Sequence, residues 1–134
     1  MAYVTKATTS GGRNGRAVLE GGVLGLAMGF PKELGGAGDG HNPEQLFAIG
    51  YSACFGQAIL VVAKKHGLDG QDARVTCSIT MDKDEISFSF KAEINVSLPG
   101  ADKDKVQALM EEAHTICPYS KATKGNIPVK LTVV

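Results

Sequence analysis

The residues of this sequence best suited to chemistry are its three cysteines, Cys54, Cys77 and Cys117. A thiolate is a nucleophile, and a second cysteine can turn its oxidised product into a disulfide, so cysteine pairs are typical of thiol redox chemistry. Cys54 lies within the apolar segment LFAIGYSACF. A buried cysteine without a cationic neighbour has a raised pKa and packs as a small hydrophobic residue. Taken alone, Cys54 is therefore expected to be structural.

Cys117 changes this interpretation. It stands directly before Pro118, whose ring disfavours helical geometry at the preceding residue, so we expect Cys117 at a helix junction. A short turn that begins at Pro118 would place Cys117 at a helix N-terminus, where the dipole favours a thiolate. One cysteine on a rigid helix and one at a hinge suit attack followed by resolution. Cys77, in contrast, falls at an inward position of an alternating strand and is expected to be structural.

Arg13, in GGRNGRA, and Glu44, in NPEQ, are the charged residues that could assist a thiolate. A guanidinium near Cys54 would lower the pKa of its thiol, and a carboxylate would orient the guanidinium through a bidentate pair. The same two residues, like Arg16, also fit solvated surface charges, and the sequence context alone favours this second interpretation.

Other kinds of site fit the sequence less well. The segment GYSAC resembles a nucleophile elbow, but its last position should be glycine and it lies within a predicted helix. The cysteines and the histidines His41, His66 and His114 include ligand types for zinc, yet only His114 and Cys117 have helical ligand spacing. The sequence has no glycine-rich phosphate loop and no Cys-x-x-Cys motif, which disfavours nucleotide binding and thioredoxin-type exchange. We therefore expect no metal and no bound cofactor.

A long helix over residues 43–66 must position Cys54. Asn42 is a good N-cap, Pro43 suits the first helical position, and Gln45 completes a capping-box spacing. Apolar residues point in every direction from this helix, which predicts that it is buried all round. One chain of this length could cover one side only, so we expect a second copy to cover the other. Gly50 and Gly56 favour close approach of another backbone there, although a core helix can also tolerate glycines.

Shorter elements surround this helix. Apolar runs over 2–9 and 23–28, separated by glycine pairs, predict a meander of small strands, and residues 29–41 predict a loop. Alternating patterns over 75–81 and 86–98 predict a hairpin with a turn at 82–85, and a second helix over 101–116 and a last strand over 127–133 complete the chain. Strands and helices without regular crossovers favour the α+β class, in a single domain over 1–134.

The composition limits the partners. The 134 residues are 43% hydrophobic and 21% charged, and 14 Lys and Arg balance 14 Asp and Glu. This balance provides no field that would gather nucleic acid or an anionic membrane surface. The N-terminal residues lack the features of a secretory signal, and three scattered cysteines do not form a disulfide scaffold. We expect a cytoplasmic protein with a small or uncharged partner.

Four motifs identify a resemblance: GGRNGRAV, PKELGGAG, NPEQLFAIGYSACF and CPYSKATKGNIPV, in order and spanning nearly the whole chain. They resemble the organic hydroperoxide resistance proteins (Ohr), within the larger group that includes the osmotically inducible protein C (OsmC). The resemblance implies an OsmC-like intertwined homodimer with two sites at its interface. It also implies that Cys54 attacks the peroxide, that Cys117 resolves the product as a disulfide, and that Arg13 and Glu44 activate the thiolate and gate the site.

The resemblance further implies reduction of alkyl and lipid hydroperoxides, with recycling by the dihydrolipoyl group of a lipoylated protein as co-substrate. Departures from the family pattern are Ile49, where alanine is frequent, and Lys121 and Lys124, where asparagine and arginine are common; the two lysines could tune docking of the reductant. An alternative from another class is a non-catalytic redox sensor or small-ligand-binding dimer. In that case a disulfide between Cys54 and Cys117 would signal without turnover.

Overall fold

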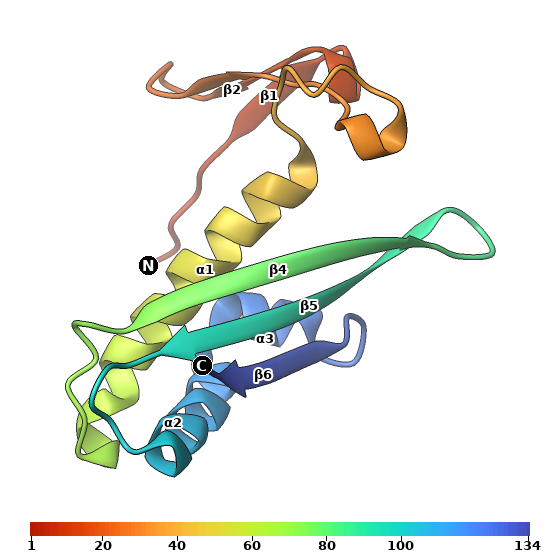
Figure 1. The fold of residues 1–134 in the computed structure, drawn as a ribbon. Helices are drawn as coiled ribbons and strands as arrows, with labels where there is room; N and C mark the ends of the chain where they lie inside the picture. The colour runs from red at the N-terminus through yellow and green to blue at the C-terminus, as the bar shows by residue number, and fades with distance from the viewer. The chain divides into compact units, whose positions relative to one another are not determined.

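The fold was analysed in a computed structural model that describes all 134 residues (Figure 1). The chain divides into two compact units, Met1–Leu46 and Phe47–Val134, and each is described by itself. The α+β class is confirmed, because helices accompany two sheets whose strand pairs are antiparallel in all but one case. The single domain expected over 1–134 stays a prediction.

The N-terminal unit contains an antiparallel meander of β1 (Ala7–Ser10), β2 (Arg16–Leu19) and β3 (Gly25–Ala27). The predicted meander is therefore confirmed, with shorter outer strands than expected. The middle strand was missed because four residues between glycine-rich turns give too short a pattern. The predicted loop over 29–41 also contains one turn of 3-10 helix, Lys32–Leu34. The expectation that this loop contains no secondary structure was therefore wrong for these three residues.

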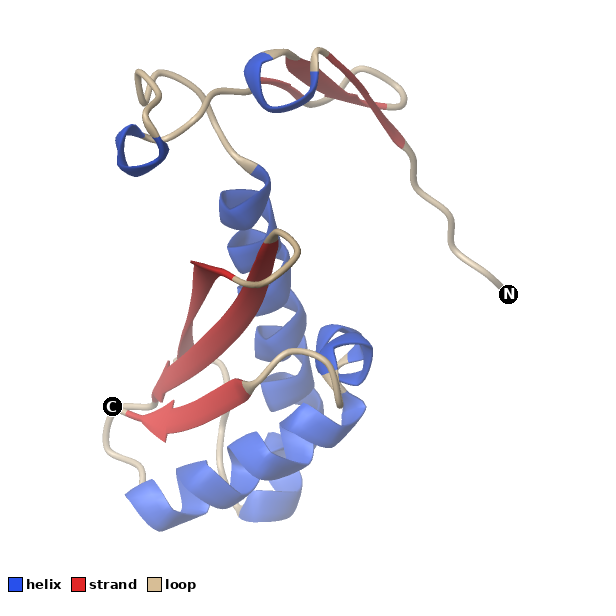
Figure 2. Cartoon of the chain, turned by 90° about the vertical axis from the view of Figure 1, so that its right-hand side faces the viewer, coloured by secondary structure: helices blue, strands red, loops and turns tan.

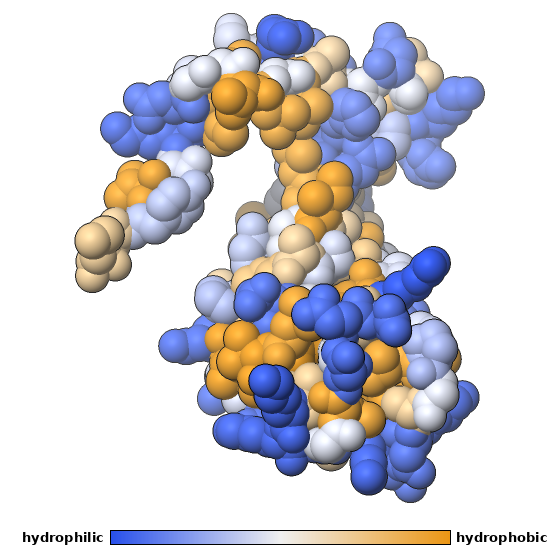
Figure 3. Space-filling view, turned by 90° about the vertical axis from the view of Figure 1, so that its left-hand side faces the viewer, coloured by the Kyte–Doolittle hydropathy of each residue, from blue (hydrophilic) through white to orange (hydrophobic).

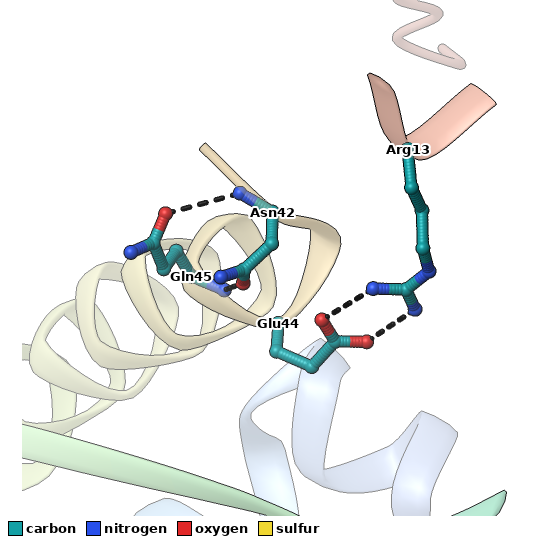
Figure 4. A network of polar contacts seen from close by, with 4 residues as sticks. All are labelled: Arg13, Asn42, Glu44 and Gln45. Carbon is teal, nitrogen blue, oxygen red and sulfur yellow. Dashed lines mark hydrogen bonds and ion pairs between the residues drawn. The ribbon is translucent and has the colours of Figure 1, made fainter. Parts of the chain in front are cut away.

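The long helix α1 (Pro43–Val62) continues into a 3-10 turn, Ala63–His66, so its predicted extent is confirmed. Its start is the capping box that the sequence predicts. The side chain of Asn42 accepts a hydrogen bond from the Gln45 amide at 2.9 Å, and the side chain of Gln45 accepts one from the Asn42 amide at 3.0 Å (Figure 4). These two bonds satisfy amides that a helix N-terminus otherwise leaves unpaired.

The C-terminal unit has one sheet in the order β4-β5-β6. Strands β4 (Arg74–Lys83) and β5 (Phe88–Ser97) form the predicted antiparallel hairpin, and β6 (Val129–Val133) lies parallel to β5. The turn lies two residues later than predicted. The Asp84 side chain accepts hydrogen bonds from the amides of Ile86 and Ser87, which fixes the turn at that point.

Three helices lie on one face of this sheet: α1, α2 (Lys103–Ile116) and α3 (Pro118–Thr123) (Figure 2). The core between the sheet and the helices contains the largest fully buried apolar side chains, which are Tyr51, Phe55, Ile59, Ile94, Val96, Val106, Leu109 and Met110. The predicted break at Pro118 is confirmed, since α2 ends and α3 begins on either side of Cys117.

In the single chain, helix α1 is buried on one side only, as expected for one copy, and its burial all round stays a prediction. Ile49 and Val61 are 65% and 61% exposed, whereas Tyr51 and Phe55 on other faces are fully buried. Figure 3 shows hydrophobic side chains at the surface of the larger unit. Large apolar residues on a helix cost free energy when they face water. This bare face is what the predicted second copy would cover, and the homodimer stays a prediction.

The segment Pro43–His66 is also long and apolar enough to cross a membrane, with a mean hydropathy of 1.9. The core helix of a soluble protein meets the same criterion. Here Tyr51, Phe55 and Ile59 pack into the hydrophobic core of the C-terminal unit. Packing in the core therefore accounts for part of this hydropathy, and the absence of a membrane partner stays a prediction.

Candidate active site

Cys54 and Cys117 lie side by side in the C-terminal unit. The Cys117 thiol donates a hydrogen bond to Cys54 Sγ, and the two sulfur atoms are 3.3 Å apart. Both cysteines are unpaired thiols. Cys54 is partly buried in α1, whereas Cys117 has no exposed surface. The separation is short enough for a disulfide to form with a small local shift, since a disulfide joins sulfurs about 2 Å apart.

Cys117 occupies the helix junction that Pro118 predicts. The backbone of Cys117 is extended, with φ −63° and ψ 122°. Cys117 is both the C-cap of α2 and the N-cap of α3. A single non-helical residue therefore joins the two helices. Because the following proline disfavours helical geometry at this position, the sequence itself places the second thiol between two rigid segments.

The Cys54 thiol is in an environment that raises its pKa. Burial makes the largest contribution, and the neighbouring Cys117 thiol raises the pKa further. A hydrogen bond from the backbone of Tyr119 acts in the opposite direction and favours the thiolate. Tyr119 lies in the first turn of α3, where backbone amides have no partner within the helix. Within its own unit, Cys54 is therefore held mainly as a thiol.

Gly50 makes room for Tyr119 within its own chain. A Cβ atom at Gly50 would lie 2.5 Å from Tyr119 Oη and 3.0 Å from its Cζ, so an alanine would have to displace the ring. Within the chain, the close neighbour of Gly50 is thus a side chain, and the approach of a second copy's backbone stays a prediction. At Gly56 a Cβ atom would meet only Val75 Cγ2 at 3.9 Å, so nothing within the chain requires glycine there.

Arg13 and Glu44 form a bidentate ion pair in the N-terminal unit (Figure 4). The two guanidinium nitrogens donate to the two carboxylate oxygens at 2.8 and 2.6 Å. Arg13 lies on a 3-10 turn, Gly12–Asn14, and Glu44 lies in the first turn of α1. Hydrogen bonding to Arg13 lowers the pKa of Glu44, and the same bond raises the pKa of Arg13. The pair is present although the sequence context alone favours solvated surface charges, and its role toward Cys54 stays a prediction.

Cys77 lies on β4 opposite Ile94, partly buried against the core. Burial raises the pKa of its thiol to about 11, and the neighbouring Cys117 contributes to that rise. A thiol with such a pKa is almost wholly protonated at neutral pH, so it is a poor nucleophile. This environment agrees with the structural role predicted for Cys77.

Replacing Cys77 with alanine is therefore expected to leave thiol chemistry at Cys54 and Cys117 near the wild-type level. The loss of a partly buried sulfur should lower the free energy of unfolding by about 1 kcal/mol. Denaturant unfolding and the rate of thiol oxidation, measured on the same preparation, check this expectation. A marked loss of oxidation rate in a variant that remains folded would assign Cys77 a chemical role.

The geometry does not support the nucleophile elbow or the zinc site that were considered from the sequence. Ser52 lies within α1 and its hydroxyl donates to the carbonyl of Ile49 at 3.0 Å, as in an ordinary helix, so it is not at a strand-to-helix elbow. No three His, Cys, Asp or Glu side chains are placed so that they could hold a metal ion. The cysteine pair is thus the chemically distinctive feature of the C-terminal unit.

Comparison with known proteins identifies the family of this chain. The family model described as OsmC-like protein matches residues 36–132. An organic hydroperoxide resistance protein from Xanthomonas axonopodis pv. citri is 44% identical over 135 residues, covering 99% of this chain and 95% of the relative. The chain belongs to the OsmC/Ohr family. The predicted resemblance is therefore confirmed.

Solved structures of family members extend the match to the fold. A crystal structure of an organic hydroperoxide resistance protein from Legionella pneumophila has a TM-score of 0.91 at 40% identity, covering 99% of this chain and 98% of that one. The corresponding protein from Elizabethkingia anophelis has a TM-score of 0.90 at 44% identity, covering 99% and 96%. Its crystals contained thiocyanate. The α+β fold of this chain is thus the OsmC/Ohr fold.

Sequence reasoning gave no role to Tyr51, Ser120 and Tyr119 beside the cysteine pair, and it considered His114 only as a possible zinc ligand. Tyr51, His114 and Ser120 are joined by hydrogen bonds, and Tyr119 supplies the backbone contact to Cys54. Tyr51 resembles an ordinary core residue in the sequence, and Ser120 lies 69 residues away from it. Tyr51, His114 and Ser120 each lie three residues from one of the two cysteines in the sequence. This spacing is the one sequence signal that could have indicated them.

Proposed function

We propose that this protein reduces organic hydroperoxides, with Cys54 as the attacking thiolate and Cys117 as the resolving thiol. The observation that carries the proposal is the 3.3 Å separation of two free thiols on different helical segments, one partly exposed and one fully buried. The names of the family members support peroxide resistance as the biological role. The partly exposed sulfur is the one that a substrate can reach.

The proposed reaction has three steps. The Cys54 thiolate attacks the terminal oxygen of the hydroperoxide, the O–O bond breaks, and the organic oxygen leaves with a proton as an alcohol. Cys54 is then a sulfenic acid. The Cys117 thiolate attacks this sulfur, a disulfide forms, and the oxygen leaves as water. A dithiol finally reduces the disulfide and becomes oxidised itself. We propose the dihydrolipoyl group of a lipoylated protein for this last step.

The first step needs a group that favours the Cys54 thiolate, since residues of its own unit mainly raise its pKa. The proposal assigns this task to Arg13, whose fixed charge is oriented by two hydrogen bonds from its guanidinium to Glu44. A guanidinium beside a thiol stabilises the charged form and can donate to the oxygens of the peroxide. We propose that Arg13 and Glu44 serve the cysteine of a second copy in a homodimer.

Aromatic side chains near the cysteine pair support an organic substrate. Phe47 lies seven residues before Cys54, on the same face of α1. Its ring centroid is 6.0 to 6.1 Å from those of Tyr51, Phe90 and Tyr119. The organic part of a hydroperoxide gains about 0.8 kcal/mol for each methylene that it buries, whereas hydrogen peroxide has none to bury. Alkyl and lipid hydroperoxides are therefore the proposed substrate class.

One observation favours a second candidate, a redox sensor that reacts once and then signals. The raised pKa of Cys54 in its own unit would make its reaction with peroxides slow. A sensor needs only a stoichiometric disulfide, whereas an enzyme needs a reductant that reopens it. The proposed cytoplasmic location, where thiols are kept reduced, is compatible with both candidates.

The two candidates differ in turnover. With cumene hydroperoxide and dihydrolipoamide in excess over protein, the proposed enzyme consumes many equivalents of peroxide at a steady rate. A sensor consumes one equivalent and stops. Mass spectrometry after the reaction should find the Cys54–Cys117 disulfide in either case. Consumption that stops after one equivalent, with the reductant still present, would reject the catalytic proposal.

A further inference from the structure

Four polar side chains form a hydrogen-bonded chain in the interior of the C-terminal unit. His114 Nδ1 lies 2.7 Å from Ser120 Oγ, Ser120 Oγ lies 2.8 Å from Tyr51 Oη, and Tyr51 Oη lies 3.3 Å from Thr123 Oγ1. Tyr51, Ser120 and Thr123 are at most 2% exposed. Buried hydroxyl groups destabilise a core unless they are paired, and here each of the three hydroxyls has a hydrogen-bond partner.

The hydrogen-bonded side chains lie close to the two cysteines in the sequence. His114 and Ser120 lie three residues before and three residues after Cys117, on α2 and α3 respectively. Tyr51 lies three residues before Cys54 on α1. Residues three apart on a helix share a face. The three side chains therefore connect the helical turns that carry the two thiols.

Backbone hydrogen bonds alone leave the junction free to turn. The Cys117 amide donates to the carbonyl of Ala113 and the Cys117 carbonyl accepts from the amide of Lys121, both at 2.9 Å. These bonds close each helix onto Cys117, but neither crosses from α2 to α3. The bond between His114 and Ser120 does cross the junction, and the bond between Ser120 and Tyr51 ties it to α1.

We propose that His114, Ser120 and Tyr51 are positioning residues that hold Cys117 Sγ opposite Cys54 Sγ and thereby set the rate at which the disulfide closes. We call these three side chains the junction brace. The inference rests on the proposed function of the cysteine pair, but it concerns the resolving step and not the attack on the peroxide. None of the three side chains needs to contact the substrate for this role.

The brace matters because the sulfenic acid has two fates. Cys117 can attack it, or a second peroxide can oxidise it to the sulfinic acid, which a thiol does not reverse. A Cys117 thiolate that is correctly oriented wins this competition, because orientation of reacting groups contributes strongly to rate. Loosening the junction should therefore slow closure and increase over-oxidation, while the first attack by Cys54 keeps its rate.

The test compares Ser120→Ala, which removes the central hydroxyl, with Ser120→Thr, which retains it. Tyr51→Phe removes the second bond without changing the ring. Thr115→Ala is the matched control. The Thr115 hydroxyl lies on the same turn of α2 as His114, but it donates a hydrogen bond only to the carbonyl of Glu112. All variants carry Cys77→Ala, so that two thiols remain, and thermal unfolding verifies that each is folded.

Closure can be measured without peroxide by using the aromatic disulfide DTNB. Cys54 attacks DTNB and releases one thionitrobenzoate, and Cys117 then attacks the mixed disulfide and releases the second as the Cys54–Cys117 bond forms. Ser120→Ala and Tyr51→Phe should slow the second release by about tenfold, as expected for one lost hydrogen bond in the reacting geometry. Ser120→Thr and Thr115→Ala should close within about twofold of the parent rate.

An unchanged second release in folded Ser120→Ala and Tyr51→Phe would overturn the brace. Slower closure together with a larger sulfinic fraction after peroxide, at an unchanged rate of first attack, would support it. The assay also separates the two proposals. A parent protein that closes quickly with DTNB but consumes no organic hydroperoxide retains the brace and rejects the proposed function.

Discussion

Replacing Cys54 with serine is expected to abolish the reduction of organic hydroperoxides, and replacing Cys117 with serine is expected to limit the protein to one turnover. A serine hydroxyl at position 54 cannot form the sulfenic acid, so peroxide consumption should fall to the uncatalysed rate. Without the Cys117 thiol, the sulfenic acid formed at Cys54 has no partner 3.3 Å away and should be oxidised further by excess peroxide.

Mass spectrometry distinguishes the two variants. Cys54→Ser should keep its mass after treatment with cumene hydroperoxide, whereas Cys117→Ser should gain two or three oxygens on Cys54. The structural control is Cys77→Ala, which removes the third thiol and should behave as the wild type. Steady turnover of either Cys54→Ser or Cys117→Ser with a dithiol would show that the roles of the cysteines are assigned wrongly.

Mixing two inactive variants, Cys54→Ser and Arg13→Ala, is expected to restore activity when their subunits exchange. The proposal places Arg13 and Glu44 beside the Cys54 of a second copy. Ten positions of α1 separate Glu44 from Cys54, and a helix rises about 1.5 Å per residue, so the glutamate side chain does not reach that thiol along its own helix. In a mixed dimer, one of the two sites would combine an intact Arg13 with an intact Cys54.

Random exchange of equal amounts would make about half of the dimers mixed, each with one complete site, so activity should recover to about a quarter of the wild-type level. The control mixes Cys54→Ser with the double variant that carries both Cys54→Ser and Arg13→Ala. This mixture should remain inactive. Mixed dimers that form, as shown by native mass spectrometry, but do not reduce hydroperoxide would place Arg13 and Cys54 of one site in the same chain. The alternative role for Glu44 is a favourable interaction with the N-terminus of α1 alone. That interaction would contribute at most about 1 kcal/mol to the free energy of unfolding.

Local signals in the sequence predict the elements that position the cysteines. The start of α1 follows from Asn42, Pro43 and Gln45, which act within four residues of one another. The junction at Cys117 follows from Pro118, because a proline restricts the residue before it. Such signals depend only on neighbours in the chain, so no knowledge of the tertiary structure is needed to interpret them.

Features that depend on distant residues could not be predicted in this way. Arg13 and Glu44 are 31 residues apart, and their ion pair forms only because the glycine-rich turn and the start of α1 meet. Gly50 has the Tyr119 ring as its close neighbour within the chain, and this ring lies 69 positions further along the sequence. The junction brace likewise joins three helices through side chains that resemble ordinary core and surface residues.

The short distance between the two sulfurs has a consequence for the kind of thiol that can restore the reduced protein. In the proposed cycle, an incoming thiol opens the disulfide at the more exposed Cys54 and releases the Cys117 thiolate. That thiolate remains beside the mixed disulfide, at an effective concentration far above that of any free thiol, and expels a simple monothiol before a second molecule arrives. A dithiol carries its own second sulfur and completes the exchange within the same encounter. In the proposed cycle, this kinetic competition would favour dithiols over monothiols such as glutathione as the reductant.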